Sequence, residues 1–275
     1  MSTKSVARGP TLRHGPDGAR EEALDAIVIE EPLELRVDGD TLAITMRTPG
    51  HDHELAAGLL FSEGLVASRD DLGGMHHCGR PGDDGYGNTL EVTAAPGTKL
   101  GLERLDLARR GTLTTASCGV CGRRSIDDLL ARSAQIDDDT TFGRDLIVSA
   151  TARLAEAQPV FRETGGLHAA GVVGANGELL LAREDVGRHN AVDKVVGRLL
   201  LDGLLPARGR LLVVSGRTSF EIVLKAVLAG FPALVAVSAP TSLAVETARR
   251  AGLTLVGFSR GGSFNAYSCA ERIRV

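Results

Sequence analysis

The sequence contains no tryptophan, aromatic residues make up only 3% of its 275 residues, and there are four cysteines. Glycine, by contrast, occurs 34 times. Because glycine has no side chain to limit the backbone, this balance favours tight turns and close backbone approach over large aromatic pockets.

The chain also lacks long apolar segments. No uninterrupted apolar run reaches the ~18 residues that a membrane-spanning helix needs. The first twenty residues include Lys4, Arg8, Arg13 and Arg20 but no apolar core, so we predict a disordered head over 1–22 and no signal peptide. We therefore expect a cytoplasmic protein, in which cysteines normally stay reduced.

Neither a strong net charge nor a complete nucleotide motif is present. The formal net charge is -4 and the pI is about 6.0, which argues against general binding to nucleic acid or to a membrane surface. A full Gly-x-Gly-x-x-Gly or P-loop sequence is missing, so no standard motif identifies a nucleotide ligand. The length suits two small domains or one elaborated domain.

The N-terminal part has the alternating pattern of β-structure. Apolar and polar residues alternate over 33–46 on both sides of an Asp-Gly turn, which predicts a β-hairpin. A helix is predicted over 51–63 and a further strand over 88–93. We therefore predict a small β-rich α+β domain over 23–110.

The C-terminal part, residues 111–275, has the pattern of an α/β domain. After a predicted hairpin over 164–182, near-continuous apolar strands at 211–216, 233–238 and 253–258 alternate with helices. Such strands indicate a mixed, partly parallel sheet covered on both faces. Ligands of such sheets bind beyond the carboxyl ends of the parallel strands, where hydroxyls, glycines and arginines suit a phosphate-bearing anion: Ser215, Arg217, Ser238, Ser259, Arg260, Gly261 and Gly262.

The sequence TTASCGVCGRR at 114–124 carries Cys118 and Cys121, with glycine after each and arginines following. A helix is predicted directly after it, and both the helix dipole and the guanidinium charges favour the nucleophilic thiolate. Three other readings stay open at this point: half of a zinc site, a thioredoxin-like redox pair or a structural disulfide. Zinc would need two more ligands, and no second Cys-x-x-Cys exists.

A second candidate for metal binding is the segment of His76, His77 and Cys78. The two adjacent histidines would point to opposite faces of a strand, so they are not expected to share a metal.

The densest polar segment is REDVGRHN at 183–190, directly before a predicted helix over 191–201. A helix cap needs one or two polar groups, which is fewer than this segment supplies. An exposed charged loop with internal ion pairs is the simple alternative. The residues alone do not assign its function.

Together, five segments resemble the formate dehydrogenase accessory sulfurtransferases, the FdhD family. The likeness runs from about residue 27 to about residue 267 and rests on motifs in the same order: SCGVCG (117–122), GGLHAA (165–170), REDVGRHNAVDK (183–194), SGR (215–217) and GFSRG (257–261).

This resemblance implies a sulfurtransferase that takes persulfide sulfur from a cysteine desulfurase. It would pass that sulfur to the bis-molybdopterin guanine dinucleotide cofactor before the cofactor enters formate dehydrogenase. The family's persulfide-carrying cysteine falls on Cys118, and Cys121 assists transfer, releases sulfide by forming a disulfide, or only packs. The implied cofactor-binding segment is Phe258, Ser259, Arg260, Gly261, Gly262 and Ser263.

The implied fold is a small N-terminal domain followed by a cytidine-deaminase-like domain. Zinc deaminases use His-x-Glu with Pro-Cys-x-x-Cys, whereas this chain has Ala170 two residues after His168 and Ser117 before its first motif cysteine. Deaminase chemistry is therefore not expected, and no structural metal is expected either. The alternative function is a non-catalytic chaperone for the molybdenum cofactor, and a homodimer is compatible with the sequence.

Overall fold

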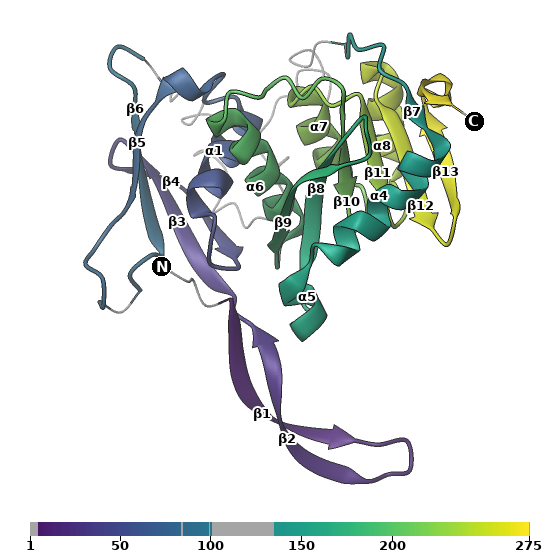
Figure 1. Cartoon of the computed structure of the whole chain (residues 1–275). Helices are drawn as coiled ribbons and strands as arrows, with labels where there is room; N and C mark the ends of the chain where they lie inside the picture. Colours follow the sequence, from purple (N-terminus) through teal and green to yellow (C-terminus); the bar gives the residue numbers. More distant parts are fainter. Residues whose placement is uncertain (1–4, 84, 99, 101–134, 275) are drawn as a thin grey trace.

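The computed structural model describes residues 5–83, 85–98, 100 and 135–274. Its larger sheet has six strands in the order β13-β12-β11-β10-β8-β9, in which β10, β11 and β12 are parallel and the other neighbours are antiparallel (Figure 1). The α/β class with a mixed, partly parallel sheet is confirmed. The strands are β8 (His168–Gly174), β9 (Leu179–Asp185), β10 (Arg210–Val214), β11 (Ala233–Ala236), β12 (Thr254–Arg260) and β13 (Ser263–Ser268).

Helices cover both faces of this sheet. The helices α6 (Arg188–Leu201), α7 (Phe220–Leu228) and α8 (Ser242–Ala251) pack on one face, and α4 (Arg144–Glu156) packs on the other. Strand β10 shows why its sequence is continuously apolar: Leu212 and Val214 belong to the first core and Leu211 and Val213 to the second. The short helix α5 (Pro159–Thr164) follows α4 after a break at Ala157 and Gln158. Pro159 begins the new helix.

A second, four-stranded sheet has the order β4-β3-β6-β5, and α1 (Asp52–Glu63) packs on it. The predicted hairpin is present, with Asp38 and Gly39 both at positive φ, as a two-residue turn of this kind requires. The strands are β3 (Glu31–Val37), β4 (Asp40–Arg47), β5 (Leu72–His77) and β6 (Thr89–Ala94). Smaller elements are η1 (Arg69–Asp71), η2 (Ala270–Arg272) and the paired short strands β7 (Phe142–Gly143) and β14 (Ile273–Arg274).

The two sheets are joined through α1 and α6, which lie side by side (Figure 1). A Cβ added at Gly58 would overlap the carbonyl group of Asp193, and one added at Gly197 would overlap that of Glu54. These two glycines therefore allow the helix backbones to approach more closely than side chains would permit. The expected domain boundary at 110 lies outside the described residues.

The N-terminal residues differ from the expectation of a disordered head over 1–22. Strands β1 (Val6–His14) and β2 (Arg20–Val28) form an antiparallel hairpin that projects from the body of the molecule (Figure 1). We call this hairpin, residues 5–29, the arm. Its many charged side chains concealed the strand pattern in the sequence. No helix among the described residues is long and apolar enough to cross a membrane.

Candidate functional site

The predicted sulfur-carrying pair, Cys118 and Cys121, lies outside the described residues. The described residues on either side of it belong to different parts of the molecule. Leu100 is buried in the core of the four-stranded sheet. The amide of Ile136 donates to the carbonyl of Ala251 at the end of α8, at 2.9 Å.

The carboxyl ends of the three parallel strands lie next to one another, as predicted. The amide of Val237 donates to the carbonyl of Val214 at 3.2 Å, and the amide of Phe258 donates to the carbonyl of Ser238 at the same distance. Ser215 follows Val214 directly, so the structure brings Ser215, Ser238 and Phe258 to one edge of the sheet. We call this the carboxyl edge.

Ser215 and Arg217 occupy the loop between β10 and α7. The hydroxyl of Ser215 accepts a hydrogen bond from the amide of Ala169 at 2.9 Å, which fixes the loop to β8. Arg217 is exposed. The neighbouring Thr218 is buried and holds the loop after β11, because its amide donates to the carbonyl of Ala239 at 3.2 Å. The carboxyl edge thus offers one exposed guanidinium on a well-fixed backbone.

Ser259 differs from its expected place at the edge. It is completely buried, its Oγ donates to the carbonyl of Ile147 at 3.2 Å, and its own carbonyl accepts from Thr151 Oγ1 at 2.9 Å. Both partners are on α4, so Ser259 faces the core on that side. The physical reason is the positive φ of Phe258 (54°), which interrupts the alternation of side chains at the irregularity in the β12–β13 pairing. Ser259 therefore holds the segment in place and does not line the edge.

The rest of the segment is the tip of a hairpin. Gly261 and Gly262 form the turn between β12 and β13, both at positive φ. Arg260 is exposed, and its guanidinium carbon lies 5.9 Å from the centre of the Phe258 ring. Ser263 Oγ donates to the carbonyl of Arg260 at 3.2 Å. The tip thus presents one arginine beside an aromatic face, which suits a planar or anionic ligand group.

His168 lies beside the carboxyl edge, and the sequence analysis compared it with a deaminase histidine but did not assign it to the site. It begins β8, is half-buried and packs against Gly216, where a Cβ would lie 3.3 Å from its Nδ1. Burial lowers the pKa of His168, and the positive charge of Arg188 lowers it further. At neutral pH the imidazole is therefore neutral and able to accept a proton. The sequence signal was its place in the GGLHAA motif.

The starts of α6 and α7 meet near His168. His189 Nε2 lies 2.9 Å from Glu221 Oε2 and 3.2 Å from Ser219 Oγ. Nε of Arg188 is buried and has no hydrogen-bond partner among the described residues. The carboxyl edge and these helix starts together supply a neutral imidazole, guanidinium groups and hydroxyls, which suit an anionic ligand rather than a metal ion.

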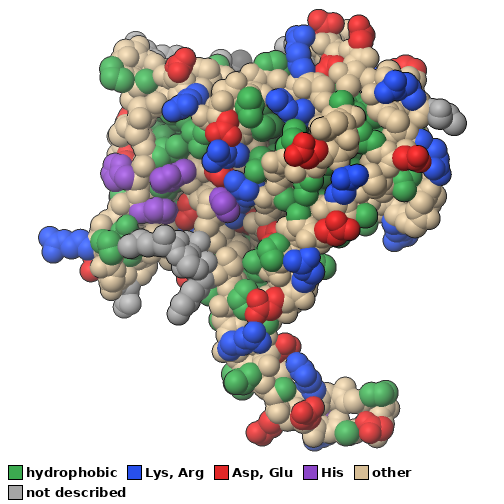
Figure 2. Space-filling view, in the orientation of Figure 1, with side chains coloured by type: hydrophobic (Ala, Val, Ile, Leu, Met, Phe, Trp, Pro, Cys, Tyr) green, Lys and Arg blue, Asp and Glu red, His purple; other side chains and the backbone are tan. Residues whose placement is uncertain are grey.

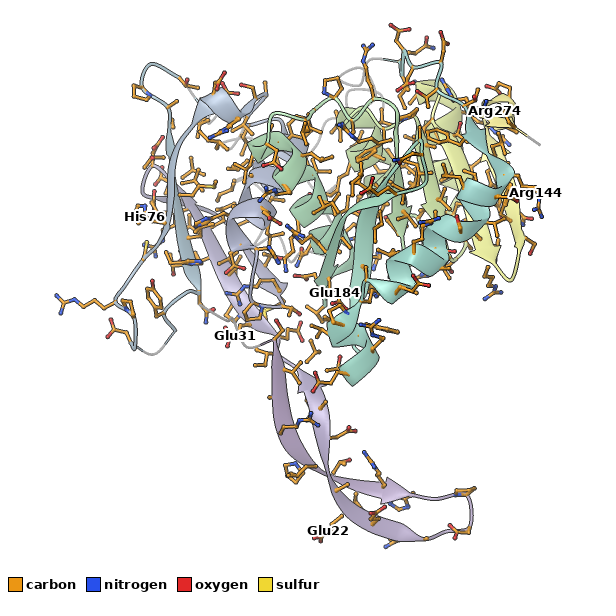
Figure 3. The ribbon with its side chains drawn as sticks, viewed as in Figure 1. Glu22, Glu31, His76, Arg144, Glu184 and Arg274 are labelled. Atoms are coloured by element: carbon orange, nitrogen blue, oxygen red, sulfur yellow. The ribbon has the colours of Figure 1, made fainter. Side chains whose placement is uncertain are left out.

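The polar segment 183–190 is for the most part not the exposed loop that the simple alternative expected. Asp185 is completely buried and accepts from Lys194 Nζ (2.7 Å) and from the amide of Thr48 (3.2 Å). Lys194 also donates to the carbonyl of Thr48 at 3.0 Å. Arg183 pairs with Glu54 on α1 through two contacts of 2.5 and 2.8 Å. Figure 3 shows the labelled Glu184 close to the base of the arm, at the end of β9. The segment therefore ties the N-terminal unit to the six-stranded sheet.

Histidines gather on the side of the molecule that carries the four-stranded sheet (Figure 2). The rings of His53 and His77 stack at 5.7 Å, and His77 Nε2 lies 3.6 Å from Asp52 Oδ2. Burial lowers the pKa of His53, as does the neighbouring His77. His76 lies on the opposite side of β5 and is exposed (Figure 3). Within the described residues, no group of three or more His, Cys, Asp and Glu side chains is arranged to hold a metal ion.

Comparisons with known proteins agree with these motifs. The model of the FdhD/NarQ family matches residues 28–274. A protein of Anaeromyxobacter dehalogenans named sulfur carrier protein FdhD is 50% identical over 275 residues, which cover 98% of this chain and 94% of the relative. A protein of the same name from Streptomyces avermitilis is 50% identical over 262 residues, covering 94% and 92%. The crystal structure of a protein described as a formate dehydrogenase accessory protein from Desulfotalea psychrophila superposes with a TM-score of 0.75 at 25% identity, covering 98% and 99% of the two chains.

Proposed function

The chain belongs to the FdhD/NarQ family, and from this premise we propose that it is a sulfur carrier in the maturation of formate dehydrogenase. Its cysteine desulfurase partner would supply the sulfur, and the acceptor would be the bis-molybdopterin guanine dinucleotide cofactor, bound as cargo. The observation that carries the proposal is the Cys118–Cys121 motif in a chain half identical to proteins named sulfur carriers.

The loading step is a thiol–persulfide exchange. The Cys118 thiolate attacks the outer sulfur of the desulfurase persulfide, a new S–S bond forms on Cys118, and the desulfurase cysteine leaves as its thiolate. No net oxidation occurs, because one S–S bond replaces another. Release of sulfide from Cys118 then needs two electrons, which the thiol of Cys121 would supply by forming a Cys118–Cys121 disulfide. His168 supports proton transfer near the acceptor, since its neutral imidazole can take up a proton.

The carboxyl edge is the proposed place for the cofactor's guanine nucleotide ends. Arg217 and Arg260 are exposed there and suit diphosphate oxygens. The ring of Phe258 beside Arg260 offers a face on which a flat base can stack. Ser215 and Ser238 add hydroxyls next to the strand ends, and Gly261 and Gly262 let the backbone come close to a ligand. Ser259 and Ser263 contribute by holding this segment in shape.

Mass spectrometry after incubation with a desulfurase and cysteine tests the carrier. A mass increase of about 32 Da, one sulfur atom, is expected on the peptide that contains Cys118. Cys118→Ala should abolish it, whereas Cys121→Ala should accept sulfur but deliver it less well.

Cys269→Ala is the matched control. Burial raises the pKa of the Cys269 thiol, with Glu271 adding to the effect, so this cysteine is a poor nucleophile and its loss should leave loading unchanged. If Cys118→Ala accepts sulfur as well as the parent protein, the carrier proposal is wrong. If the parent protein and all variants accept no sulfur but the parent binds the cofactor, the chaperone alternative is favoured.

A further inference from the structure

Among the described elements, three helices begin at the carboxyl edge, and they differ in how their first turns are capped. Strand β9 runs in the same direction as β10, because both are antiparallel to β8, so α6 starts at this edge together with α7 and α8. Thr241 caps α8 by accepting from the amide of Ala244 at 3.3 Å. Within the described chain, neither Gly187 before α6 nor Ser219 before α7 makes a side-chain capping bond. The starts of α6 and α7 therefore keep amide donors and partial positive charge.

The side chains around the start of α6 make this place positive. His168 begins β8 and pairs in register with Asp185 on β9, two residues before Gly187. Burial lowers the pKa of His168 and the charge of Arg188 lowers it further, so the guanidinium lies close to the imidazole. Asp185 does not offset this charge, because Lys194 pairs with it at 2.7 Å.

Arg188, the first residue of α6, has a donor that points to a ligand. Its Nε is buried and has no hydrogen-bond partner among the described residues. Arg183 and Lys194 of the same segment are, by contrast, both paired with carboxylates. A buried donor without a partner destabilises a fold, so such donors are rare in native proteins. An anion that accepts a hydrogen bond at the start of α6 would satisfy this donor.

The backbone that carries Arg188 is fixed by its neighbour. His189 Nε2 lies 2.9 Å from Glu221 Oε2 and 3.2 Å from Ser219 Oγ. A carboxylate only accepts hydrogen bonds, so Nε2 carries the hydrogen. These contacts join the start of α6 to the start of α7 and occupy the carboxylate of Glu221 with His189. The donors of Arg188 are therefore held ready for a ligand.

This cluster adjoins the carboxyl edge without being part of it. Gly216 lies against His168, because a Cβ at this position would be 3.3 Å from Nδ1. The flanking Ser215 and Arg217 belong to the carboxyl edge, and the amide of Ser215 donates to the carbonyl of Ala169 at 3.0 Å. One loop thus separates the two places, and a ligand bound at the carboxyl edge can reach the cluster with its other end.

We propose that His168, Arg188 and the first-turn amides of α6 form a subsite for a small oxyanion, separate from the nucleotide site at the carboxyl edge. Its N–H donors suit the metal-bound oxygen atoms at the sulfur-accepting end of the cargo. The preference for an anion follows from these donors alone, because the guanidinium of Arg188 is always charged and repels a free cation. The identity of the occupant rests on the proposed function.

Calorimetry with molybdate, a tetrahedral metal oxyanion, tests the subsite. The parent protein should bind molybdate, and Arg188→Gln should weaken this binding at least ~10-fold, because a charge-assisted contact is lost. Arg188→Lys should regain part of the affinity, since it restores the charge. Arg208→Ala removes an exposed arginine at the opposite edge of the sheet and should bind molybdate as the parent does. A parent that does not bind molybdate, or an Arg188→Gln variant that binds it equally well, would overturn the subsite.

GDP shows whether the two sites are separate. Arg188→Gln should bind GDP with the affinity of the parent, which also shows that the variant is folded. A variant with an unchanged thermal midpoint that loses both ligands would mean one shared site. Displacement of molybdate by GDP from the parent protein would mean the same, and either result contradicts the proposal.

Competition with the whole cofactor identifies the occupant. Bis-molybdopterin guanine dinucleotide, extracted from a molybdenum enzyme, should displace molybdate, because its metal end would take the same donors. If molybdate stays bound beside the cofactor, the subsite takes a free oxyanion and its assignment to the cargo is wrong. None of these measurements needs sulfur on Cys118, so a failure of sulfur loading counts against the proposed function and leaves the oxyanion subsite standing.

Discussion

Two segments, 183–194 and 258–263, each place arginine and glycine next to the end of a strand. Both lie within the residues that the family model matches. In the first, Asp185 is 0% exposed and Lys194 is 1% exposed, because the N-terminal unit packs over them. In the second, Arg260 and the following glycines are exposed, because the β12–β13 hairpin extends beyond the end of β11.

This difference separates two uses of polar residues. A buried charge must be paired, since water no longer stabilises it, and such pairs fix how elements are joined. An exposed arginine on a fixed turn keeps its donors for a ligand. We therefore expect substitutions in the first segment to change folding stability and substitutions in the second to change binding.

The largest effect is expected from Lys194→Met. The variant leaves the buried carboxylate of Asp185 without its cation, so it should lower the free energy of unfolding by about 3–5 kcal/mol. Urea unfolding measures this directly. The control is Arg198→Ala, which removes a pair with Asp202 at 2.7 Å and a longer one with Glu54 at 3.8 Å. Because Arg198 is 47% exposed, its loss should change stability by about 1 kcal/mol or less. Equal effects of both variants would contradict the structural role of the buried pair.

The exposed segment is tested with Arg260→Ala. GDP serves as a fragment of the cofactor. Loss of one charge-assisted contact should weaken the binding of GDP by about 1.5–3 kcal/mol, or roughly tenfold or more in the dissociation constant. Stability and sulfur loading should not change. Arg208→Ala, an exposed arginine just before β10 at the opposite edge of the sheet, is the control for nonspecific charge. Calorimetry decides between them: unchanged affinity in Arg260→Ala removes this residue from the site, and no binding by the parent removes the nucleotide site.

A third prediction tests the joint between the sheets without changing any charge. In Gly197→Ala, the added methyl group meets the backbone of Glu54, so α1 and α6 must move apart, at a cost of about 1–3 kcal/mol. Gly143→Ala is the control, because a Cβ there meets no atom within 4 Å. Thermal unfolding of both variants should show a lower midpoint for Gly197→Ala only.

The last prediction concerns the pH dependence of folding stability that Glu54 contributes, which is small near neutral pH and appears in acid. Burial alone would raise its pKa, but hydrogen bonds from Arg183 and His51 outweigh burial and lower the pKa to about 2, from an ordinary value of 4.5. A carboxylate with a depressed pKa stabilises the folded state above pH 4.5, and this contribution is lost as the pH falls towards 2.

Thermal midpoints between pH 7 and pH 2 measure this contribution. Glu54→Gln should be less stable than the parent at pH 7, and its midpoint should decline less between pH 4.5 and 2, so that the two curves converge in acid. Parallel curves would show that Glu54 does not titrate in this window.

Local patterns were sufficient for most of the fold. The Asp38-Gly39 turn, the apolar strand around Leu212 and the convergence of Ser215 and Ser238 all follow from short-range rules, namely turn chemistry, periodicity and the common direction of parallel strands. The arm was missed because its strands carry charges on both faces and bury little against the body.

What the sequence by itself determined is the order of the elements, the α/β class and the motif residues that identify the family. Only the tertiary structure decided which polar residues are buried. Asp185 and Lys194 are buried because the N-terminal unit packs against them through the contact between α1 and α6. These two helices are more than a hundred residues apart in the chain. The side chain of Ser259 faces the core because Phe258 has a left-handed backbone conformation. This conformation shifts the alternation of side chains between the two faces of β12. Burial depends on contacts between distant segments, and local sequence patterns do not encode those contacts.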